Sequence, residues 1–311
     1  DIAGITVATV DDLQVIGDLT TTDTSEIVFD VGNNGSEVSD TLTVTGQMTM
    51  NGALEAVFIS GSAPAVGDVF NVVSFATATA GSYFDAIRGL EGDGTTLLDL
   101  DVDTSFGLVS LTAVANALTP TSGTEILNGS SGADYAYGGD GDDILYGEGG
   151  EDLLLGGAGN DRIEITDNDF SYIDGGDGTD TLLAYNGLDM TNVRNDSIDG
   201  FERLELGFGA LTLDGDDVIS ITDGTNALTG TDNTLVVTRN DFGGAVDIGS
   251  GWSAATTQTL TLDGETKTFS VQTHASTGAV IYIEQAASDI TADLDGANGF
   301  TIDVDTSGTT N

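Results

Sequence analysis

This chain contains no cysteine, two prolines and one histidine in 311 residues. Without cysteine it has no thiol nucleophile and no thiolate metal site, and its stability does not rely on disulfides. Because His274 is the sole histidine, histidine-rich zinc sites are excluded, and a Ser-His-Asp triad would have to use this residue. His274 lies in a polar segment, which favours an ordinary surface histidine. We therefore predict that the protein is not an enzyme.

Positive charge is also scarce. Six Lys and Arg residues stand against 52 acidic ones, which gives a formal net charge of −46. This balance excludes nucleic acid as a partner and opposes compaction unless cations offset it. The hydrophobic content of 39% is nevertheless ordinary for a globular protein. No apolar run approaches the ~20 residues that span a bilayer, so we expect no transmembrane segment. The chain begins at Asp1 without methionine, as expected of a processed or partial product.

Glycine is abundant, and in the middle of the chain it is periodic. Four units in nine-residue register open at Gly129, Gly138, Gly147 and Gly156, and a fifth opens at Gly175. The sixth position is always aspartate, namely Asp134, Asp143, Asp152, Asp161 and Asp180. The eighth position is always small or apolar, namely Ala136, Leu145, Leu154, Ile163 and Leu182. Such an apolar period argues against a flexible Gly/Asp-rich linker, which is the alternative interpretation.

Each unit predicts one turn and one short strand. Glycine permits the positive-φ turn, and the eighth-position side chain points inward from the strand. Two units then make one coil of a parallel β-roll, so each unit stacks on its second neighbour. The turn at Gly129 should lie over the turn at Gly147, and Gly138 over Gly156. This stacking brings aspartates and glycine carbonyls of adjacent coils together, and such a row of carboxylates repels itself unless a hard cation such as Ca²⁺ lies between them.

The block resembles the RTX calcium-binding repeat of secreted bacterial proteins, G-G-x-G-x-D-x-(apolar)-x. The resemblance implies that aspartate side chains and backbone carbonyls of the same and a stacked turn hold each ion. The implied ligands are Asp143 and Asp161 on one edge, with Asp180 next to Asp161, and Asp134 and Asp152 on the other edge. Asp140 and Asp177, at the third position, assist or stay in solvent. The implied carbonyl donors are Gly132, Gly139, Gly141, Gly150, Gly157, Gly159, Gly176 and Gly178.

Two features depart from this pattern. In the first unit Ser130 stands at the second position, where the pattern has glycine, and Ser131 follows it. In the third unit Glu148 replaces the second glycine. The stretch from Ile165 to Asp174 is ten residues long. If it forms a half-coil with Ile173 pointing inward, Ser171 occupies the aspartate position. We expect a weak or missing ion there, while the stacking of Gly175 over Gly156 is preserved.

The flanking regions are predicted to be β-rich. Residues 1–118 show alternating apolar residues such as Ile27, Phe29 and Val31. The order of their short sequence motifs resembles that in the last coils of an autotransporter-type passenger, which is a right-handed parallel β-helix. An ordinary β-sandwich is the alternative. Residues 119–127 are expected to be a linker, and 128–183 the calcium β-roll.

Residues 184–311 are expected to form a β-rich capping or assembly domain, because an open roll end exposes unpaired strand edges. The segment Ile198–Leu206 resembles the I-x-G-F-E phrase that often follows RTX blocks. Asp214, Asp216 and Asp217 could hold another Ca²⁺, but a solvated acidic turn is favoured. Trp252 is interpreted as a core residue rather than a sugar-stacking platform. The tail from Asp293 is interpreted as a linker or a strand donated to a neighbour.

The sequence thus predicts an all-β protein, a parallel β-helix/β-roll solenoid with flanking β-rich domains. The resemblance implies a secreted calcium-binding structural protein of the bacterial cell surface that leaves by type I secretion and folds on binding Ca²⁺. We expect it to form a homo-oligomer or polymer, as a surface layer (S-layer), filament or adhesive matrix, through β-rich surfaces and Ca²⁺ bridges. The alternative is a carbohydrate-binding or carbohydrate-active module, lyase-like or epimerase-like, whose partner is a cell-surface glycan.

Overall fold

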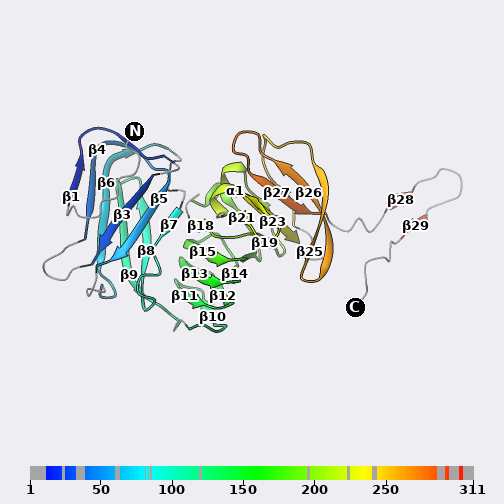
Figure 1. Cartoon of the computed structure of the whole chain (residues 1–311), viewed down its shortest axis with the longest axis horizontal. Coiled ribbons are helices and arrows are strands. Elements are labelled where there is room, and N and C mark those ends of the chain that lie inside the picture. Colours follow the sequence, from blue (N-terminus) through cyan, green and yellow to red (C-terminus); the bar gives the residue numbers. More distant parts are fainter. Residues whose placement is uncertain are drawn as a thin grey trace.

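The computed structural model describes residues 12–22, 25–32, 39–59, 64–80, 82, 84, 86–118, 121–194, 197–222, 225–239, 244–285, 291–293 and 301–303. Their regular secondary structure is almost entirely β-strand, in three successive regions (Figure 1). The proline at 120 and most of the tail lie outside the described residues. Within the tail, strands β28 (Thr291–Asp293) and β29 (Thr301–Asp303) pair antiparallel with each other.

The N-terminal region winds as a parallel solenoid and closes with a hairpin. Parallel pairing joins β1, β4 and β6 in one sheet and β3, β5 and β7 in another. This is the pairing of stacked coils and not that of a hairpin-built sandwich. The strands are β1 (Asp12–Val15), β2 (Leu19–Thr20), β3 (Glu26–Val31), β4 (Thr41–Thr49), β5 (Ala53–Phe58), β6 (Val69–Ala78), β7 (Ala86–Arg88), β8 (Thr96–Asp103) and β9 (Leu108–Ala115).

Alternation explains why this region buries a core. Ile27, Phe29 and Val31 are at most 4% exposed, as the period-two pattern predicts. The closing hairpin of β8 and β9 pairs antiparallel with β6, so the first sheet runs β1-β4-β6-β9-β8, and the short strand β2 pairs with β4.

The glycine-aspartate units form the predicted β-roll of two parallel sheets. Alternate strands enter opposite sheets, so each unit pairs with its second neighbour: Leu145 pairs with Ile163, and Ala136 with Leu154. One sheet begins with β10 (Ile126–Ser130), β12 (Ile144–Glu148), β14 (Arg162–Ile165) and β16 (Thr181–Ala184). The other contains β11 (Tyr135–Asp140), β13 (Asp152–Gly159), β15 (Phe170–Gly178) and β18 (Ile198–Asp199).

The interior of the roll is filled by the eighth-position residues. Ala136, Leu145, Leu154, Ile163 and Leu182 are all 0% exposed, which confirms their predicted inward direction. Ile173 is also fully buried and pairs with Leu154, so the ten-residue stretch preserves the stacking through a register shift near Leu153. The half-coil interpretation of that stretch is therefore confirmed.

The outer face of one roll sheet is covered by the N-terminal region. Leu153, Leu155 and Tyr172 point away from the roll interior and belong to the same hydrophobic core as the N-terminal strands. The hydroxyl of Tyr172 donates a hydrogen bond to the carbonyl of Ile87 over 3.1 Å. The two regions therefore share a buried interface, which the nine-residue pattern did not indicate.

The C-terminal region continues the other roll sheet. The strands β19 (Arg203–Leu206), β23 (Thr234–Arg239) and β27 (Val280–Glu284) extend it in parallel, and β26 (Glu265–Thr273) and β25 (Thr256–Leu262) finish it as an antiparallel hairpin. Smaller elements are β17 (Gly187–Asp189), the 3-10 helix η1 (Met190–Asn192), β20 (Ala210–Thr212), α1 (Gly215–Ile221), β21 (Thr225–Asn226), β22 (Thr231–Asp232) and β24 (Val246–Asp247). Val218 and Ile221 of α1 belong to the core that fills the roll.

The acidic cluster at the start of α1 is solvated only in part, since Asp214 and Asp216 are exposed as predicted but Asp217 is buried. Asp214 caps the helix by accepting hydrogen bonds from the N–H groups of Asp216 and Asp217, and the side chain of Asp217 in turn accepts one from the N–H of Asp214. Asp217 is only 7% exposed. This reciprocal arrangement is a capping box, which satisfies backbone donors at the start of the helix. Helix capping therefore accounts for Asp214 and Asp217.

Candidate metal centre

The aspartates of the repeats lie in two columns of turns, one at each edge of the roll. We call the turns that carry Asp143, Asp161 and Asp180 the first column, and those that carry Asp134 and Asp152 the second. In the second column the turn after Asp152 carries Ser171 in place of an aspartate. The strand registers place successive members of each column on adjacent coils. This is the two-edge arrangement predicted from the spacing.

Within the first column, one oxygen of each aspartate joins two coils. The main-chain N–H of Asp143 donates to Oδ1 of Asp161 over 2.7 Å, and the N–H of Asp161 donates to Oδ1 of Asp180 over 2.6 Å. The column begins with the N–H of Glu125, which donates to Oδ1 of Asp143 over 2.6 Å. In the second column the N–H of Asp134 donates to Oδ1 of Asp152 over 2.9 Å. The carboxylates therefore link adjacent coils by hydrogen bonds along both edges.

The second oxygen of the first-column aspartates has no hydrogen-bond partner. Oδ2 of Asp143, Asp161 and Asp180 is buried and unpaired, and these residues are at most 2% exposed. Burying a carboxylate oxygen without a partner is costly, because the charge loses its hydration. Three such atoms in successive coils are an unusual arrangement. A bound cation would offset the free-energy cost of burying them.

Burial changes the acidity of these groups. It raises the pKa of Asp161 to about 6 and the pKa of Asp180 to about 8. In the second column it raises the pKa of Asp152 to about 7. Neighbouring carboxylates add to the effect, while hydrogen bonds from backbone N–H groups oppose it. The charged forms are thus disfavoured until a positive ion is close.

Glycines bring backbone oxygens to the same place. A Cβ atom on Gly138 would lie 2.2 Å from Oδ2 of Asp143 and 2.7 Å from the carbonyl oxygen of Gly156. One coil further on, a Cβ on Gly156 would lie 2.4 Å from both Oδ2 of Asp161 and the carbonyl oxygen of Gly175. The unpaired carboxylate oxygen and a carbonyl of the next coil therefore lie close together at Gly138 and at Gly156. These carbonyls were not among the predicted donors.

The predicted carbonyl donors lie in further stacked rows. Gly139, Gly157 and Gly176 are in register, with φ of 103°, 114° and 91°. The carbonyl oxygen of Gly139 would lie 2.2 Å from a Cβ on Gly157, so only glycine fits this approach. A second row with the same close spacing consists of Gly141, Gly159 and Gly178. A Cβ on Gly159 or Gly178 would meet the carbonyl oxygen of the glycine on the preceding coil. In the other column Gly150 stacks closely on Gly132.

Some predicted side chains are not brought together. Asp140 and Asp177 are exposed, and Ala158 lies between them in the stack. Asp134 is half-buried, and its Oδ2 accepts bonds from both the N–H and the hydroxyl of Ser130, over 2.6 and 3.1 Å. The serine-containing first unit thus satisfies an oxygen whose counterparts in the first column are unpaired.

The first column continues beyond the repeats through a residue that we did not predict. Oε2 of Glu202 accepts the N–H of Asp180 over 2.7 Å, and Glu202 is 6% exposed. The carbonyl oxygen of Gly200 would lie 2.2 Å from a Cβ on Gly175, which repeats the relation seen at Gly138 and Gly156. The signal was the I-x-G-F-E phrase, whose glutamate takes the aspartate position although the spacing has grown to 22 residues.

The second column is interrupted where the sequence predicted it. The hydroxyl of Ser171 donates to the carbonyl of Asp152 over 3.0 Å, so no carboxylate bridges these coils. Across the parts of the chain that the structure describes, no group of three or more His, Cys, Asp or Glu side chains is arranged to hold a metal by itself. A cation at the turns would therefore need backbone carbonyls in addition to one or two carboxylates, the mixed oxygen shell that Ca²⁺ accepts.

The two groups considered for other chemistry have local partners. His274 is half-buried, with its ring nitrogens 2.9 Å from the Thr277 hydroxyl and 3.2 Å from the Ser250 carbonyl oxygen. Trp252 packs against the C-terminal core, as predicted, and its Nε1 donates to the Ile248 carbonyl over 2.5 Å.

Comparison with known proteins agrees with this geometry. The family model of the RTX calcium-binding nonapeptide repeat matches residues 120–154 and 128–163. No curated protein matches the chain. The chain therefore carries RTX nonapeptide repeats, and such repeats bind Ca²⁺. None of the helices in the described residues has the length and apolarity needed to cross a membrane.

Proposed function

We propose that this is a secreted structural protein of the bacterial cell surface, which folds on binding calcium and assembles into a surface layer, filament or adhesive matrix. The observation that carries the proposal is the row of buried, unpaired oxygens on Asp143, Asp161 and Asp180. These atoms destabilise the folded chain without a cation and become ligands with one. RTX repeats are typical of secreted proteins, which meet millimolar calcium outside the cell.

The net charge supports coupling between folding and binding. At −46 the chain repels itself, and compaction brings the carboxylates of the two columns closer. Calcium offsets this repulsion at the points where it is strongest. Its binding free energy then becomes folding free energy, because the site exists only when successive coils are stacked. A chain that stays unfolded at low calcium also suits export through a type I secretion channel.

The ligand assignment follows from the same geometry. In the first column, each ion would take Oδ2 of one aspartate and glycine carbonyls of its own and the next coil. Asp134 and Asp152 would serve the second column, where Ser130 already satisfies one oxygen of Asp134. Asp140 and Asp177 are exposed and are assigned to solvent or to weak outer contacts. The position at Ser171 is assigned no ion of its own.

The interface with the N-terminal region extends the effect of calcium. The roll sheet that contains Leu153, Leu155 and Tyr172 covers apolar residues of the N-terminal solenoid. If the roll unfolds, these surfaces lose their cover. Calcium bound at the turns would therefore stabilise the N-terminal region as well, through roughly 25 cal/mol for each Å² of apolar surface kept from water.

A carbohydrate-binding module is the second candidate, and a cleft favours it. A space of about 600 Å³ lies between the N-terminal region and the roll, lined in part by Phe58 and Tyr137. The cation in its lining, Arg88, pairs with Glu26 over 3.2 Å, while the acidic residues there include Glu55, Asp174 and Asp177. This lining suits a neutral glycan better than an acidic one.

Calcium titration of the purified chain tests the proposal. Circular dichroism should show β-structure appearing with calcium, and light scattering should then show assembly. A chelator should first abolish the β-signal that arises from residues 128–183. A chain that has full β-structure without calcium and does not bind the ion would overturn the proposal. Calcium-loaded monomers that retain a neutral glycan would instead favour the carbohydrate-binding candidate.

A further inference from the structure

The strand β25 ends the largest sheet and has a free edge. In the order of that sheet β25 follows β26, and among the described residues no strand pairs with its other side. The pairing with β26 is continuous over seven residues from Thr256 to Leu262, without a bulge. A free edge presents unpaired N–H and C=O groups that can pair with another strand.

This edge lacks the usual protection against pairing. Proteins blunt free edges with charges, prolines, bulges or very short strands. The sequence TTQTLTL of β25 contains no charge and no proline. By contrast β8, which ends the N-terminal sheet, carries Asp99, Asp101 and Asp103. Nothing in the sequence of β25 would repel a second strand.

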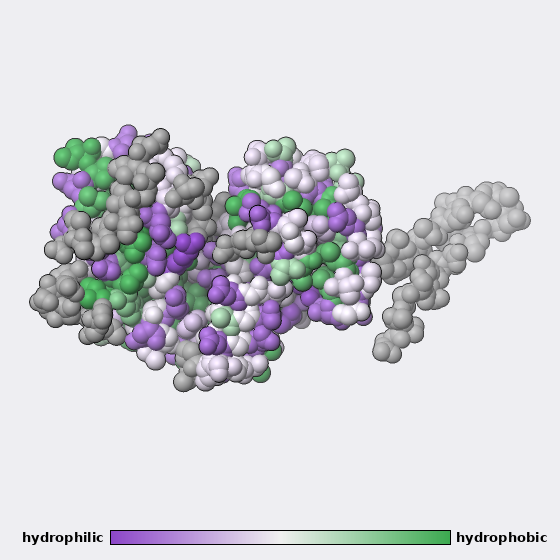
Figure 2. Space-filling view, in the orientation of Figure 1, coloured by the Kyte–Doolittle hydropathy of each residue, from purple (hydrophilic) through white to green (hydrophobic). Residues whose placement is uncertain are grey.

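The lack of charge extends well beyond the strand. No charged residue occurs between Asp247 and Asp263, although 19% of the chain is charged and a segment of that length would carry about three charges. Residues 253–259 are all exposed. In Figure 2 the rim of the C-terminal region is largely near-white, the colour of intermediate hydropathy. In a protein of net charge −46, this is a surface where two copies can meet without opposing carboxylates.

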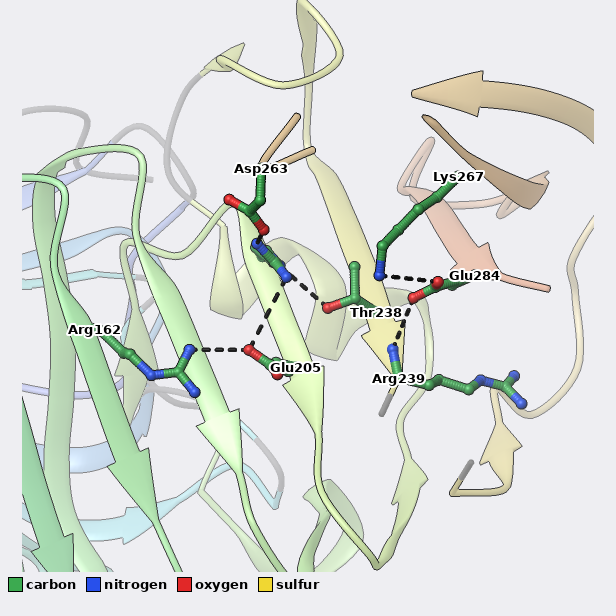
Figure 3. Close-up of polar contacts among 8 residues, drawn as sticks. Arg162, Glu205, Thr238, Arg239, Asp263, Lys267 and Glu284 are labelled. Carbon is green, nitrogen blue, oxygen red and sulfur yellow. Dashed lines mark hydrogen bonds and ion pairs between the residues drawn. The ribbon is translucent and has the colours of Figure 1, made fainter. Parts of the chain in front are cut away.

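The hairpin is held firmly from its other side. Asp263, in the turn between β25 and β26, pairs with Arg203 over 2.7 Å, and Arg203 also contacts Glu205, which pairs with Arg162 (Figure 3). Lys267 of β26 pairs with Glu284 over 3.0 Å. These contacts join the hairpin to β19 and β27, on the side away from the free edge of β25.

One face of β25 faces the core, and the other faces solvent. Leu262 is buried and Leu260 packs against the small core of the hairpin, while the hydroxyl of Tyr282 donates to Gln258 over 3.1 Å. The alternate residues Thr257, Thr259 and Thr261 therefore face solvent. Threonine pairs across antiparallel strands are favourable.

We infer that β25 is a self-association edge, at which two copies of this chain pair antiparallel through a two-fold axis near Thr259. The inference deepens the proposed assembly by naming one contact, and it rests on that proposal. A two-fold contact is self-complementary, so each strand presents the same uncharged edge to its partner. The result is one sheet that runs continuously through both copies.

Matched glutamate variants on adjacent strands test the inference. Thr259 of β25 and Thr268 of β26 are directly paired and share the solvent face, but only Thr259 lies at the edge. With calcium present, sedimentation velocity should show reversible dimers of the unaltered chain. Thr259→Glu should weaken dimerisation by roughly tenfold or more, because like charges would face each other across the axis. Thr268→Glu should change it little.

Cysteine variants locate the contact independently. The chain has no cysteine, so a single Thr259→Cys should form an intermolecular disulfide on mild oxidation, whereas Thr268→Cys should not. A full chain that stays monomeric, or equal effects at the two positions, would overturn the inference. It would also be wrong if only a chain truncated after Gln285 dimerised, because the tail would then cover the edge. These outcomes leave calcium binding unchanged, whereas loss of calcium-dependent folding would count against the proposed function.

Discussion

The N–H of Asp161 donates a 2.6 Å hydrogen bond to Oδ1 of Asp180, the aspartate of the next coil. The Oδ2 atom of Asp180 is buried without a partner. One carboxylate therefore performs two tasks: one oxygen fixes the stacking of the coils, and the other remains available for a cation. This division explains why an aspartate is needed at each turn, since a single-oxygen side chain such as Ser171 bonds to the preceding coil but has no second oxygen for a cation.

Replacement of Asp161 by asparagine separates these two tasks. Asp161→Asn keeps an oxygen that can accept the N–H of Asp143 but removes the buried charge. Without calcium the variant should be more stable than the unaltered chain, by on the order of 1 kcal/mol. Its calcium affinity should fall by roughly tenfold or more, as happens when groups that support a metal are lost. Urea unfolding and calorimetric titration measure the two effects.

The matched control for this variant is Asp140→Asn, which removes the same charge from an exposed third position. Both measurements should change little for it. Equal losses of affinity in the two variants would mean that calcium responds to net charge alone, and not to the buried oxygen of Asp161.

The metal-free protein should become more stable as pH falls from about 8 to about 4. Burial raises the pKa of Asp161 to about 6, of Asp152 to about 7 and of Asp180 to about 8, from the ordinary value of 3.8. The folded chain therefore binds protons that the unfolded chain releases. The stability that these protons contribute is complete below pH 3.8 and is lost as pH rises through 6 to 8.

Excess calcium should reverse this dependence, since protons compete with the ion for the same oxygens. Urea unfolding at pH 5 and pH 8, with and without calcium, measures both slopes. In metal-free buffer Asp180→Asn should flatten the slope, because it removes the carboxylate with the highest of these pKa values. Metal-free stability that increases with pH across this window would contradict the assignment.

Alanine at Gly157 should destabilise the roll. Gly157 has φ of 114°, and a Cβ there would lie 2.2 Å from the carbonyl oxygen of Gly139. Both the backbone conformation and the contact oppose a side chain, so Gly157→Ala should cost about 1–3 kcal/mol. In Gly132→Ala the nearest atom would be 3.9 Å away, and this variant should cost much less. Thermal unfolding in calcium compares the two, and equal melting temperatures would contradict the predicted crowding.

Glycine at position 148 should stabilise the roll. Glu148 stands where most units have glycine, and its φ is 65°, a conformation that costs a residue with a side chain about 1–2 kcal/mol. Glu148 is exposed, so its removal leaves no buried gap. Glu148→Gly should therefore raise the free energy of unfolding by about 1 kcal/mol. Glu151→Gly, at an exposed residue without positive φ, should lower it, and a loss in both variants would refute the strain at 148.

The interior of the roll was predictable because its signal is local and periodic. In a nine-residue repeat with one inward residue per unit, each unit can stack only on its second neighbour. The pairing of Ile163 with Leu145 follows from this stacking. The role of Glu202 could not be predicted in this way. It continues the aspartate column only because the longer chain between Asp180 and Glu202 returns to the same coil position. The capping role of Asp214 was missed for a related reason, since the seven-residue helix that it starts is too short to show a period.

The coil, its register and the chemistry of its turns follow from the amino-acid sequence, because glycine and aspartate at fixed spacing act on neighbours one coil apart. Which outward residues are buried depends instead on the tertiary structure. Leu153, Leu155 and Tyr172 occupy positions that the repeat leaves to solvent, and they are covered because the N-terminal solenoid packs there. The tertiary structure also decided which carboxylate oxygens remain unpaired, since that depends on every donor within reach in three dimensions. Contacts between distant segments have no period, and so no repeat in the sequence records them.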